Sequence, residues 1–221
     1  MIDLHTHTVF SDGELIPAEL VRRASVAGYT AMAITDHADL SNLDFVVPRM
    51  ASVVGDLGEA WGLTVLAGIE LTHLPPGQLE AATSKARALG ASIVVCHGET
   101  IVEPVAKGSN RAAIEAGVDI LSHPGLITLE DAQRAVELGV CLEITTRKGH
   151  SLCNGHVARI AREVGALLVV NNDAHAPGDL VSPEMARKVA LGAGMSEEEF
   201  QQACRNSENL VRRAQSTAAP K

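Results

Sequence analysis

The sequence is poor in aromatic residues, in basic charge and in long apolar runs. Only 2% of its 221 residues are Phe, Tyr or Trp, and 27 acidic side chains against 18 basic ones leave a formal net charge of −9. Nucleic-acid surfaces depend on many Lys and Arg contacts to phosphates, and on aromatic side chains where they hold single strands. The composition therefore argues against an extended nucleic-acid surface. No apolar run approaches the roughly 20 residues of a membrane-spanning helix, so we expect no membrane insertion.

Cysteine is also scarce, and no secretory signal is recognisable. The four cysteines, at positions 96, 141, 153 and 204, have no C-x-x-C spacing, and the chain is long enough to form a core without disulfides. We expect reduced thiols, with Cys96 and Cys141 in the core. Met1 leads directly into the strand-like Ile2-Asp3-Leu4, without a basic stretch, an apolar stretch and a cleavage site. We therefore expect a cytoplasmic location.

Short β-rich apolar segments alternate with helical segments, a pattern typical of parallel α/β folds. Seven strands are expected, at Ile2–His7, Ala31–His37, Thr64–Leu71, Ala91–His97, Val118–His123, Val140–Thr145 and Ala166–Asn171. The length and the lack of a Pro-, Gly- or Ser-rich linker predict one domain, residues 1–214. Periodicity alone does not distinguish an open doubly wound sheet from a closed barrel.

Helix boundaries carry their own signals. The segment Pro17–Ala27 has proline in its first turn and Gly28 just after its end. A last helix is expected from Ser196 to about residue 213, because Ser196 and Glu199 have the spacing of a capping box. Residues 215–221 are expected to form a disordered tail.

Histidines and carboxylates stand at the C-terminal ends of the predicted strands, where βα barrels build their active sites. The candidates are His5, His7, Asp12, His37, Glu70, His97, His123, Asp173 and His175. A single histidine at a strand end is more often a core or capping residue than a ligand. Nine such groups gathered at one end of a barrel without metal ions would cost several kcal/mol in poorly paired polar groups. Mixed nitrogen and oxygen ligands favour zinc, manganese or iron over calcium or magnesium, and nine ligands are too many for one ion.

The order of these motifs closely resembles that of the PHP (polymerase and histidinol phosphatase) family. The resemblance extends from His5 to His175 through His5-Thr6-His7, Ser11-Asp12-Gly13, Ile34-Thr35-Asp36-His37, Gly68-Ile69-Glu70, His97-Gly98, Ser122-His123-Pro124 and Asp173-Ala174-His175. It implies a distorted (β/α)7 TIM-like barrel and a metal-dependent phosphoesterase. The implied substrate is a small phosphate ester such as histidinol phosphate, or a nucleotide.

The resemblance also implies three divalent metal ions. The implied ligands are His5, His7, Glu70 and Asp173 for the first ion, bridging Glu70 with His97 and His123 for the second, and Asp12, His37 and His175 for the third. Our hypothesis for the mechanism is attack by a hydroxide that bridges two of the ions. Glu70 would be the bridging ligand, and Asp173 or a metal-bound water would handle the proton of the leaving group.

One basic segment follows the sixth strand directly. Arg147 has the fork of donors that suits phosphate oxygens, and Lys148 and His150 are further candidates for phosphate binding. The same segment is also compatible with an ordinary solvated loop. Asp36 is expected to orient an imidazole from outside the metal shell. His73 and His156 fall on no metal motif.

Two other functions compete with the phosphoesterase. An amidohydrolase-like barrel also begins with H-x-H, but it does not need the extra set of Asp12, His37 and His175, and no lysine ends the third or fourth strand to form a bridging carbamate. A non-catalytic PHP module would usually have lost ligands, and every ligand position is filled here. Substrate identity, physiological metal and oligomeric state are left open by the sequence.

Overall fold

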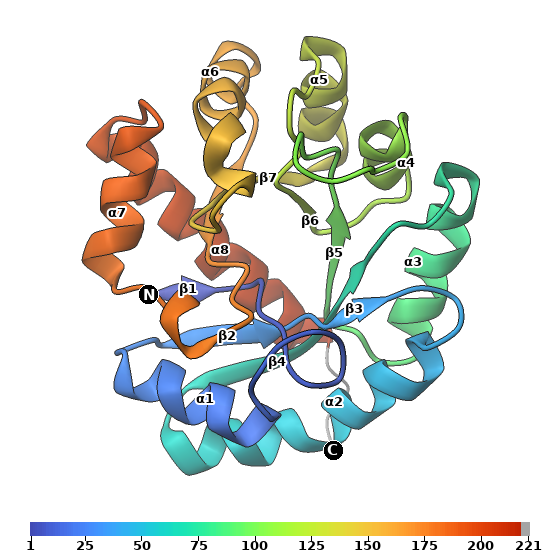
Figure 1. Ribbon diagram of the computed structural model, residues 1–221, viewed down its shortest axis with the longest axis vertical. Coiled ribbons are helices and arrows are strands. Elements are labelled where there is room, and N and C mark those ends of the chain that lie inside the picture. The colour runs from blue at the N-terminus through green and yellow to red at the C-terminus, as the bar shows by residue number, and fades with distance from the viewer. Residues whose placement is uncertain (218–221) are drawn as a thin grey trace.

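The computed structural model describes residues 1–217, which form a barrel of parallel strands inside a layer of helices (Figure 1). The strands are β1 Ile2–Asp3, β2 Ala31–Ile34, β3 His37–Ala38, β4 Thr64–Leu71, β5 Ile93–His97, β6 Ile120–Ser122, β7 Cys141–Thr145 and β8 Leu168–Asn171. They pair in the order β1-β2-β4-β5-β6-β7-β8, and the short β3 pairs with β4. The expected distorted seven-stranded TIM-like barrel is confirmed.

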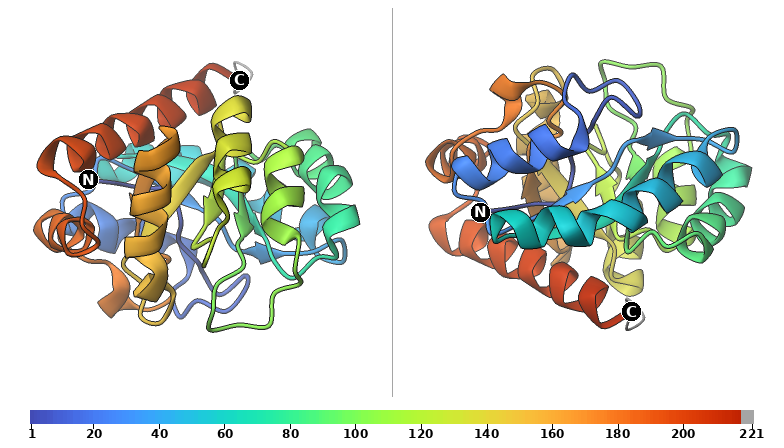
Figure 2. Two further views of the ribbon diagram at one scale, coloured as in Figure 1. Left: turned by 90° about the horizontal axis from the view of Figure 1, so that it is seen from above. Right: turned by 90° about the horizontal axis from the view of Figure 1, so that it is seen from below.

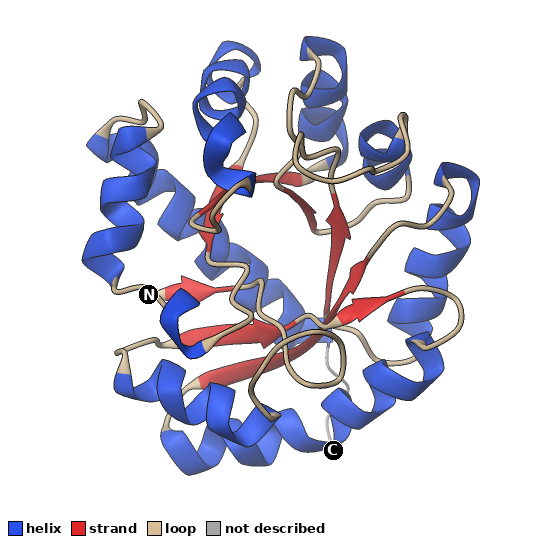
Figure 3. Cartoon of the chain, in the orientation of Figure 1, coloured by secondary structure: helices blue, strands red, loops and turns tan. Residues whose placement is uncertain are grey.

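Helices cover the outside of the strands (Figure 3). They are α1 Pro17–Val26, α2 Leu43–Trp61, α3 Leu79–Ala88, α4 Ser109–Glu115, α5 Leu129–Leu138, α6 Asn154–Val164, α7 Pro183–Gly192 and α8 Glu197–Thr217, with 3-10 turns η1 Pro76–Gln78, η2 His150–Cys153 and η3 Pro177–Asp179. None of the helices in residues 1–217 combines the length and apolarity needed to cross a bilayer.

The last helix begins as expected and ends later than expected. The Ser196 amide donates to Glu199 Oε2 (2.7 Å), and the Glu199 amide donates to Ser196 Oγ (3.2 Å), which confirms the capping box. The helix continues to Thr217, so the first three residues of the expected tail are helical. The reason is packing, because Ala214 is buried in the last turns. The rest of that segment, 218–221, lies outside the described residues.

The second expected strand is interrupted at Thr35 and Asp36. The Thr35 amide donates to the Thr6 carbonyl oxygen (2.8 Å), and the Thr6 amide donates to Thr35 Oγ1 (3.0 Å). Asp36 accepts hydrogen bonds from the amide and hydroxyl of Thr8 (2.6 and 2.8 Å) and from the hydroxyl of Ser11 (2.9 Å). Asp36 therefore shapes the loop that carries Asp12, and its expected bond to an imidazole is not what the structure has.

Side chains help to join the first and last strands. Between them the backbone forms one isolated bridge, from Thr6 to Ala174. Asn171 Oδ1 accepts a hydrogen bond from the Leu4 amide (2.9 Å), and Asp3 Oδ1 accepts one from the Asn172 amide (3.1 Å). These bonds bring the loops after β1 and β8 side by side.

The barrel is closed at its N-terminal end by α8, which crosses behind the strands in Figure 1 and across their end in Figure 2. Leu210 and Val211 of α8 pack on apolar residues inside the barrel, such as Leu4 and Val169. A second, larger core fills the space between the strands and the outer helices. All four cysteines are free thiols, as expected. Apolar packing fills the inside of the barrel at this end, and the expected histidine and carboxylate ligands lie at the other end.

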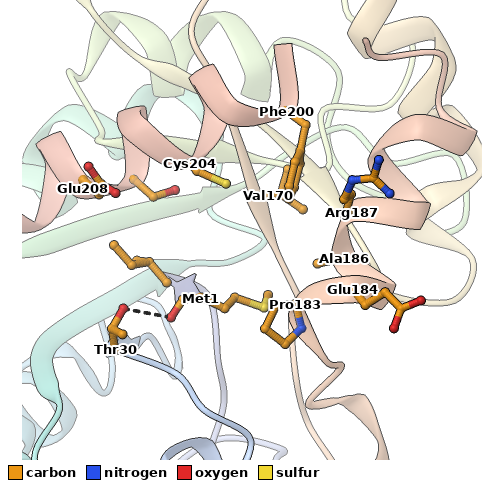
Figure 4. A pocket seen from close by; sticks show the side chains of 12 residues that line it. Met1, Thr30, Val170, Pro183, Glu184, Ala186, Arg187, Phe200, Cys204 and Glu208 are labelled. Atoms are coloured by element: carbon orange, nitrogen blue, oxygen red, sulfur yellow. Dashed lines mark hydrogen bonds between the residues drawn. The ribbon is translucent and has the colours of Figure 1, made fainter. Parts of the chain in front are cut away.

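One well-formed pocket lies away from the histidines. It has a volume of about 440 Å³ and lies between the N-terminal ends of the first strands and helices α7 and α8 (Figure 4). Val170, Pro183, Ala186 and Phe200 are among the residues that line it, and its lining includes no histidine. The pocket is therefore not part of the metal-binding chemistry described below.

Candidate metal centre

The nine expected ligands converge at the C-terminal end of the barrel. The loop after β1 carries His5, His7 and Asp12; β3, β4 and β5 carry His37, Glu70 and His97; and the loops after β6 and β8 carry His123, Asp173 and His175. Six of the nine are almost completely buried, His37 and His175 are partly exposed, and Asp12 is exposed. The set is therefore layered, with its deepest members around Glu70.

The first group consists of His5, His7, Glu70 and Asp173. His5 Nε2 lies 3.2 Å from Glu70 Oε1 and 3.6 Å from Asp173 Oδ1. His7 Nε2 lies 3.2 Å from Asp173 Oδ1 and 3.7 Å from Glu70 Oε2. Ligand atoms of one tetrahedral zinc ion, with bonds of about 2.0–2.1 Å, are about 3.3–3.4 Å apart. The first group therefore fits a divalent metal ion.

The third group consists of Asp12, His37 and His175. The Nε2 atoms of the two histidines are 3.4 Å apart and lie 3.4 and 3.2 Å from Asp12 Oδ1. His37 Nδ1 is engaged by Thr72 Oγ1 (2.7 Å), and His175 Nδ1 by the Asp173 carbonyl oxygen (3.0 Å). Since an imidazole that donates through Nδ1 presents the lone pair of Nε2, both rings are oriented as ligands.

The second group consists of His97, His123 and His150, whose ligand atoms lie within 4.8 Å of one another. His97 and His123 belong to the expected set, whereas His150 was expected to bind phosphate. Glu70, the expected bridging ligand, has Oε1 3.8 Å from His123 Nε2. The second group therefore borders the first through His123.

Several nitrogens of these groups have no hydrogen-bond partner within residues 1–217. They include His5 Nε2, His123 Nδ1 and both ring nitrogens of His7. Buried polar atoms are nearly always paired in native proteins, and each unpaired one costs about 1–3 kcal/mol. Unpaired imidazole nitrogens that face carboxylates therefore fit a site for metal ions.

Burial and mutual charge shift the pKa values of the site in opposite directions. Burial alone would raise the pKa of Glu70, but the His5 and His37 imidazoles outweigh it and lower that pKa well below its usual value. Burial and then the neighbouring imidazole of His37 lower the pKa of His7, and burial followed by His97 does the same to the pKa of His123. An ionised Glu70 with neutral His7 and His123 is the protonation state that binds metal. Burial lowers the pKa of His5 and of His37, but the Glu70 carboxylate outweighs it and raises both pKa values, so these two imidazoles release a proton when metal binds.

The backbone is strained at two of the ligands. His123 and Asp173 have φ angles of 25° and 54°, which are unusual for residues other than glycine. Such conformations cost about 1–3 kcal/mol each and persist only where the surroundings enforce them. Part of that enforcement comes from Gly125 (φ 61°), where an added Cβ would lie 1.9 Å from the Glu99 carbonyl oxygen. The loops after β5 and β6 are therefore interlocked beside His123.

Glu143 is a functional candidate that sequence reasoning missed. It is fully buried in β7, and its Oε1 accepts hydrogen bonds from His5 Nδ1 (2.8 Å) and Asn171 Nδ2 (2.9 Å). Its Oε2 accepts one from the His123 amide (3.1 Å). Glu143 thereby holds His5 with Nε2 directed at the first group. The sequence feature that could have identified Glu143 is its carboxylate in the middle of the otherwise uncharged strand 141–145.

The basic segment lies at the edge of the site. Arg147 Nη1 is 3.0 Å from Asp179 Oδ2, and its Nε is 3.9 Å from Asp173 Oδ2. Lys148 is exposed on the same loop. Of the unassigned histidines, His156 Nε2 is 2.8 Å from the Ile127 carbonyl oxygen and is remote from the three groups, whereas the His73 ring stacks on His97 with centroids 5.3 Å apart.

Comparisons with known proteins identify the family of the chain. The profile of the PHP domain family matches residues 3–138. An uncharacterized protein of Methanocaldococcus jannaschii is 51% identical over 201 residues, 90% of this chain and 92% of that protein. A probable phosphatase of Shewanella sp. strain MR-4 is 31% identical over 205 residues, 79% of this chain and 76% of that protein.

A solved structure supports the fold. Histidinol phosphate phosphatase of Lactococcus lactis, in complex with zinc, L-histidinol and phosphate, superimposes with a TM-score of 0.62 over 88% of this chain and 94% of that one, at 15% identity. At this identity the likeness concerns the fold alone. With the family profile covering more than half of its residues, the chain belongs to the PHP domain family.

Proposed function

We propose that this protein hydrolyses a phosphate ester at a centre of three divalent metal ions. The observation that carries the proposal is the convergence of histidines and carboxylates in adjoining clusters, which share His5, His7 and His123, at one end of the barrel. One zinc ion takes about four protein ligands, so groups that lie side by side support a centre with several ions. Family membership supports a phosphate ester as the bond that is cleaved. The proposed substrate is a small phosphomonoester, such as histidinol phosphate, or a nucleotide.

The first group would hold one ion, the third group another, and His97 with His123 a third beside Glu70. Zinc, manganese and iron all suit these ligands. When bound, such ions lower the pKa of water and neutralise phosphoryl oxygens. The chain itself supplies the orientation, because Glu143 fixes the His5 ring and Thr72 fixes the His37 ring.

Arg147 is the proposed phosphate-binding residue. Its side chain is 29% exposed, and its guanidinium lies beside Asp173 and contacts Asp179. A planar fork of donors fixed at the edge of a metal centre suits two phosphate oxygens at once. Asp173, between the imidazoles and this guanidinium, is the proposed catalytic carboxylate next to Glu70. Lys148 would add positive charge at the entrance.

The test combines metal analysis with turnover. Purified protein would be analysed for zinc, manganese and iron, and phosphate release would be measured from histidinol phosphate, nucleotides and an aryl phosphate. Two or three ions per chain together with turnover is the expected result. Absence of metal after reconstitution would overturn the metal centre, and metal without phosphate release from any ester would overturn the phosphoesterase.

Arg147 provides a sharper test of substrate binding. Arg147→Ala should raise KM at least about tenfold, and Arg147→Lys should recover only part of this loss because it keeps the charge but not the fork. Arg159→Ala, on the exposed face of α6, is the matched control. An unchanged KM in Arg147→Ala would show that the segment is only a solvated loop.

A further inference from the structure

A tenth ligand-type residue, Glu103, lies over the second group. It belongs to the loop between β5 and α4 and is 37% exposed. Its Oε2 is 3.2 Å from His97 Nε2, and its Oε1 is 3.3 Å from His150 Nε2. Glu103 is not part of the ligand set that the sequence motifs imply. Its position therefore needs a separate explanation.

The two imidazoles that face Glu103 are oriented in the same way. His97 Nδ1 is 3.1 Å from the Gly98 carbonyl oxygen, and His150 Nδ1 is 2.9 Å from Thr100 Oγ1. Each ring can donate through Nδ1, which leaves the Nε2 lone pair directed at Glu103. The His150 side chain is only 9% exposed, and its ring stacks on His123 with centroids 4.2 Å apart. His150 is therefore built into the second group.

Glu70 approaches the second group less closely than Glu103 does, since its Oε1 is 3.8 Å from His123 Nε2. Its Oε1 accepts a hydrogen bond from Ser122 Oγ (2.7 Å), and its Oε2 is 2.7 Å from His37 Nδ1. One oxygen is therefore held beside the strand that leads to His123, and the other is held at the third group. The separations of Glu103 from His97 and His150 match the roughly 3.3–3.4 Å between ligands of one tetrahedral zinc ion.

We infer that Glu103 and His150 are ligands of the second metal ion, together with His97 and His123. This inference rests on the metal centre of the proposed function and adds two residues to it. Three imidazoles and one carboxylate match the number and kind of ligands that zinc takes, and Glu70 of the first group lies next to His123. Glu103 is the only one of the four on the exposed side, so it is the ligand that an incoming phosphate oxygen can replace.

The experiment measures metal affinity and geometry without relying on turnover. The intact protein, Glu103→Gln and His150→Gln would be loaded with zinc, dialysed and analysed for zinc content, and the affinity of each ion would be measured by competition with a chelator. Substitution with cobalt would report coordination through visible absorption. His73→Asn is the matched control, since His73 Nε2 is 3.4 Å from Glu103 Oε2 but lies outside the proposed set, and asparagine tolerates its φ of 54°.

Both ligand variants should lose one ion per chain, or bind it more weakly by more than the about 10–100-fold typical of losing an outer-shell partner. The remaining ions should bind as before, the cobalt spectrum should change, and the His73→Asn variant should match the unmodified protein. Unchanged affinity and spectra in both ligand variants would overturn the inference and leave the proposed function intact. A protein that binds no zinc at all before substitution would overturn the proposed metal centre itself.

Discussion

Glu143→Gln is the substitution that most directly tests how the centre is positioned. Glu143 receives hydrogen bonds from three donors, which are His5 Nδ1, Asn171 Nδ2 and the His123 amide. Glutamine has the same shape but replaces one oxygen with an NH2 group, and in either orientation that group faces a donor. The substitution therefore disturbs a fully buried network without creating a cavity.

The expected loss follows from these bonds. If the NH2 group faces the His123 backbone, one buried amide is left unsatisfied at a cost of about 1–3 kcal/mol. If it faces His5, the imidazole is driven to the tautomer with hydrogen on Nε2, which cannot bind metal. Outer-shell substitutions of this kind typically weaken metal binding about 10–100-fold, or about 1.4–2.7 kcal/mol. We expect one ion of the first group to weaken by that factor.

The assay is zinc competition with a chelator of known affinity, at fixed pH and ionic strength. Asp119→Asn is a matched control, because Asp119 is also a buried carboxylate but binds the Val94 amide (2.8 Å) and Arg87 (3.2 Å) at the opposite end of the barrel. The control should lose stability and keep its zinc affinity. Zinc affinity within twofold of the original protein in Glu143→Gln would refute the positioning role.

Three further predictions concern stability. Burial raises the pKa of Asp3 to about 7, so in metal-free protein the stability from its protonation is full below about pH 4 and is lost as the pH rises through 7. Asp3→Asn should remove this pH-dependent change in unfolding free energy, which amounts to up to about 4 kcal/mol. If urea unfolding gave the same change in unfolding free energy between pH 5 and 8 for both proteins, the prediction would be wrong. Gly125→Ala should lower the unfolding free energy by more than about 1 kcal/mol in excess of the loss caused by the control Gly139→Ala. Gly139 has a similar φ but nothing within 4 Å of an added Cβ. Equal melting temperatures for the two variants would reject the interlocked loops. Zinc at 100 times its Kd should stabilise chelator-treated protein by about 2.7 kcal/mol, and no rise in Tm on adding zinc would count against metal-linked stability.

The barrel could be predicted because its signals are local. Alternating apolar segments marked the seven strands of the barrel, though not the short separate β3, and the spacing of Ser196 and Glu199 marked the start of the last helix. Boundaries were less accurate where tertiary contacts override local preference. The expected strand 31–37 is divided because Thr35 and Asp36 bond to the first loop, and the last helix extends to Thr217 because its end packs on the barrel.

The site was predictable to the extent that ligands stand at strand ends. In a parallel barrel those ends share one face, so His5, Glu70 and Asp173 could be grouped without knowing any loop. Glu143 lies within a strand and acts through other side chains, and Glu103 lies on a loop of no regular pattern. Their positions depend on how neighbouring loops interlock, which no single segment of sequence encodes.

The layout of the site also explains why its backbone is strained. His123 and Asp173 adopt positive φ angles, and His123 is held through its own amide by Glu143. The same carboxylate holds the His5 ring, so one buried residue positions ligands from two separate loops. Metal ions that bind these ligands would stabilise a conformation that the strand ends alone do not favour. The stability of the fold and the geometry of the centre are therefore coupled through Glu143, and a change in either should be detectable in the other.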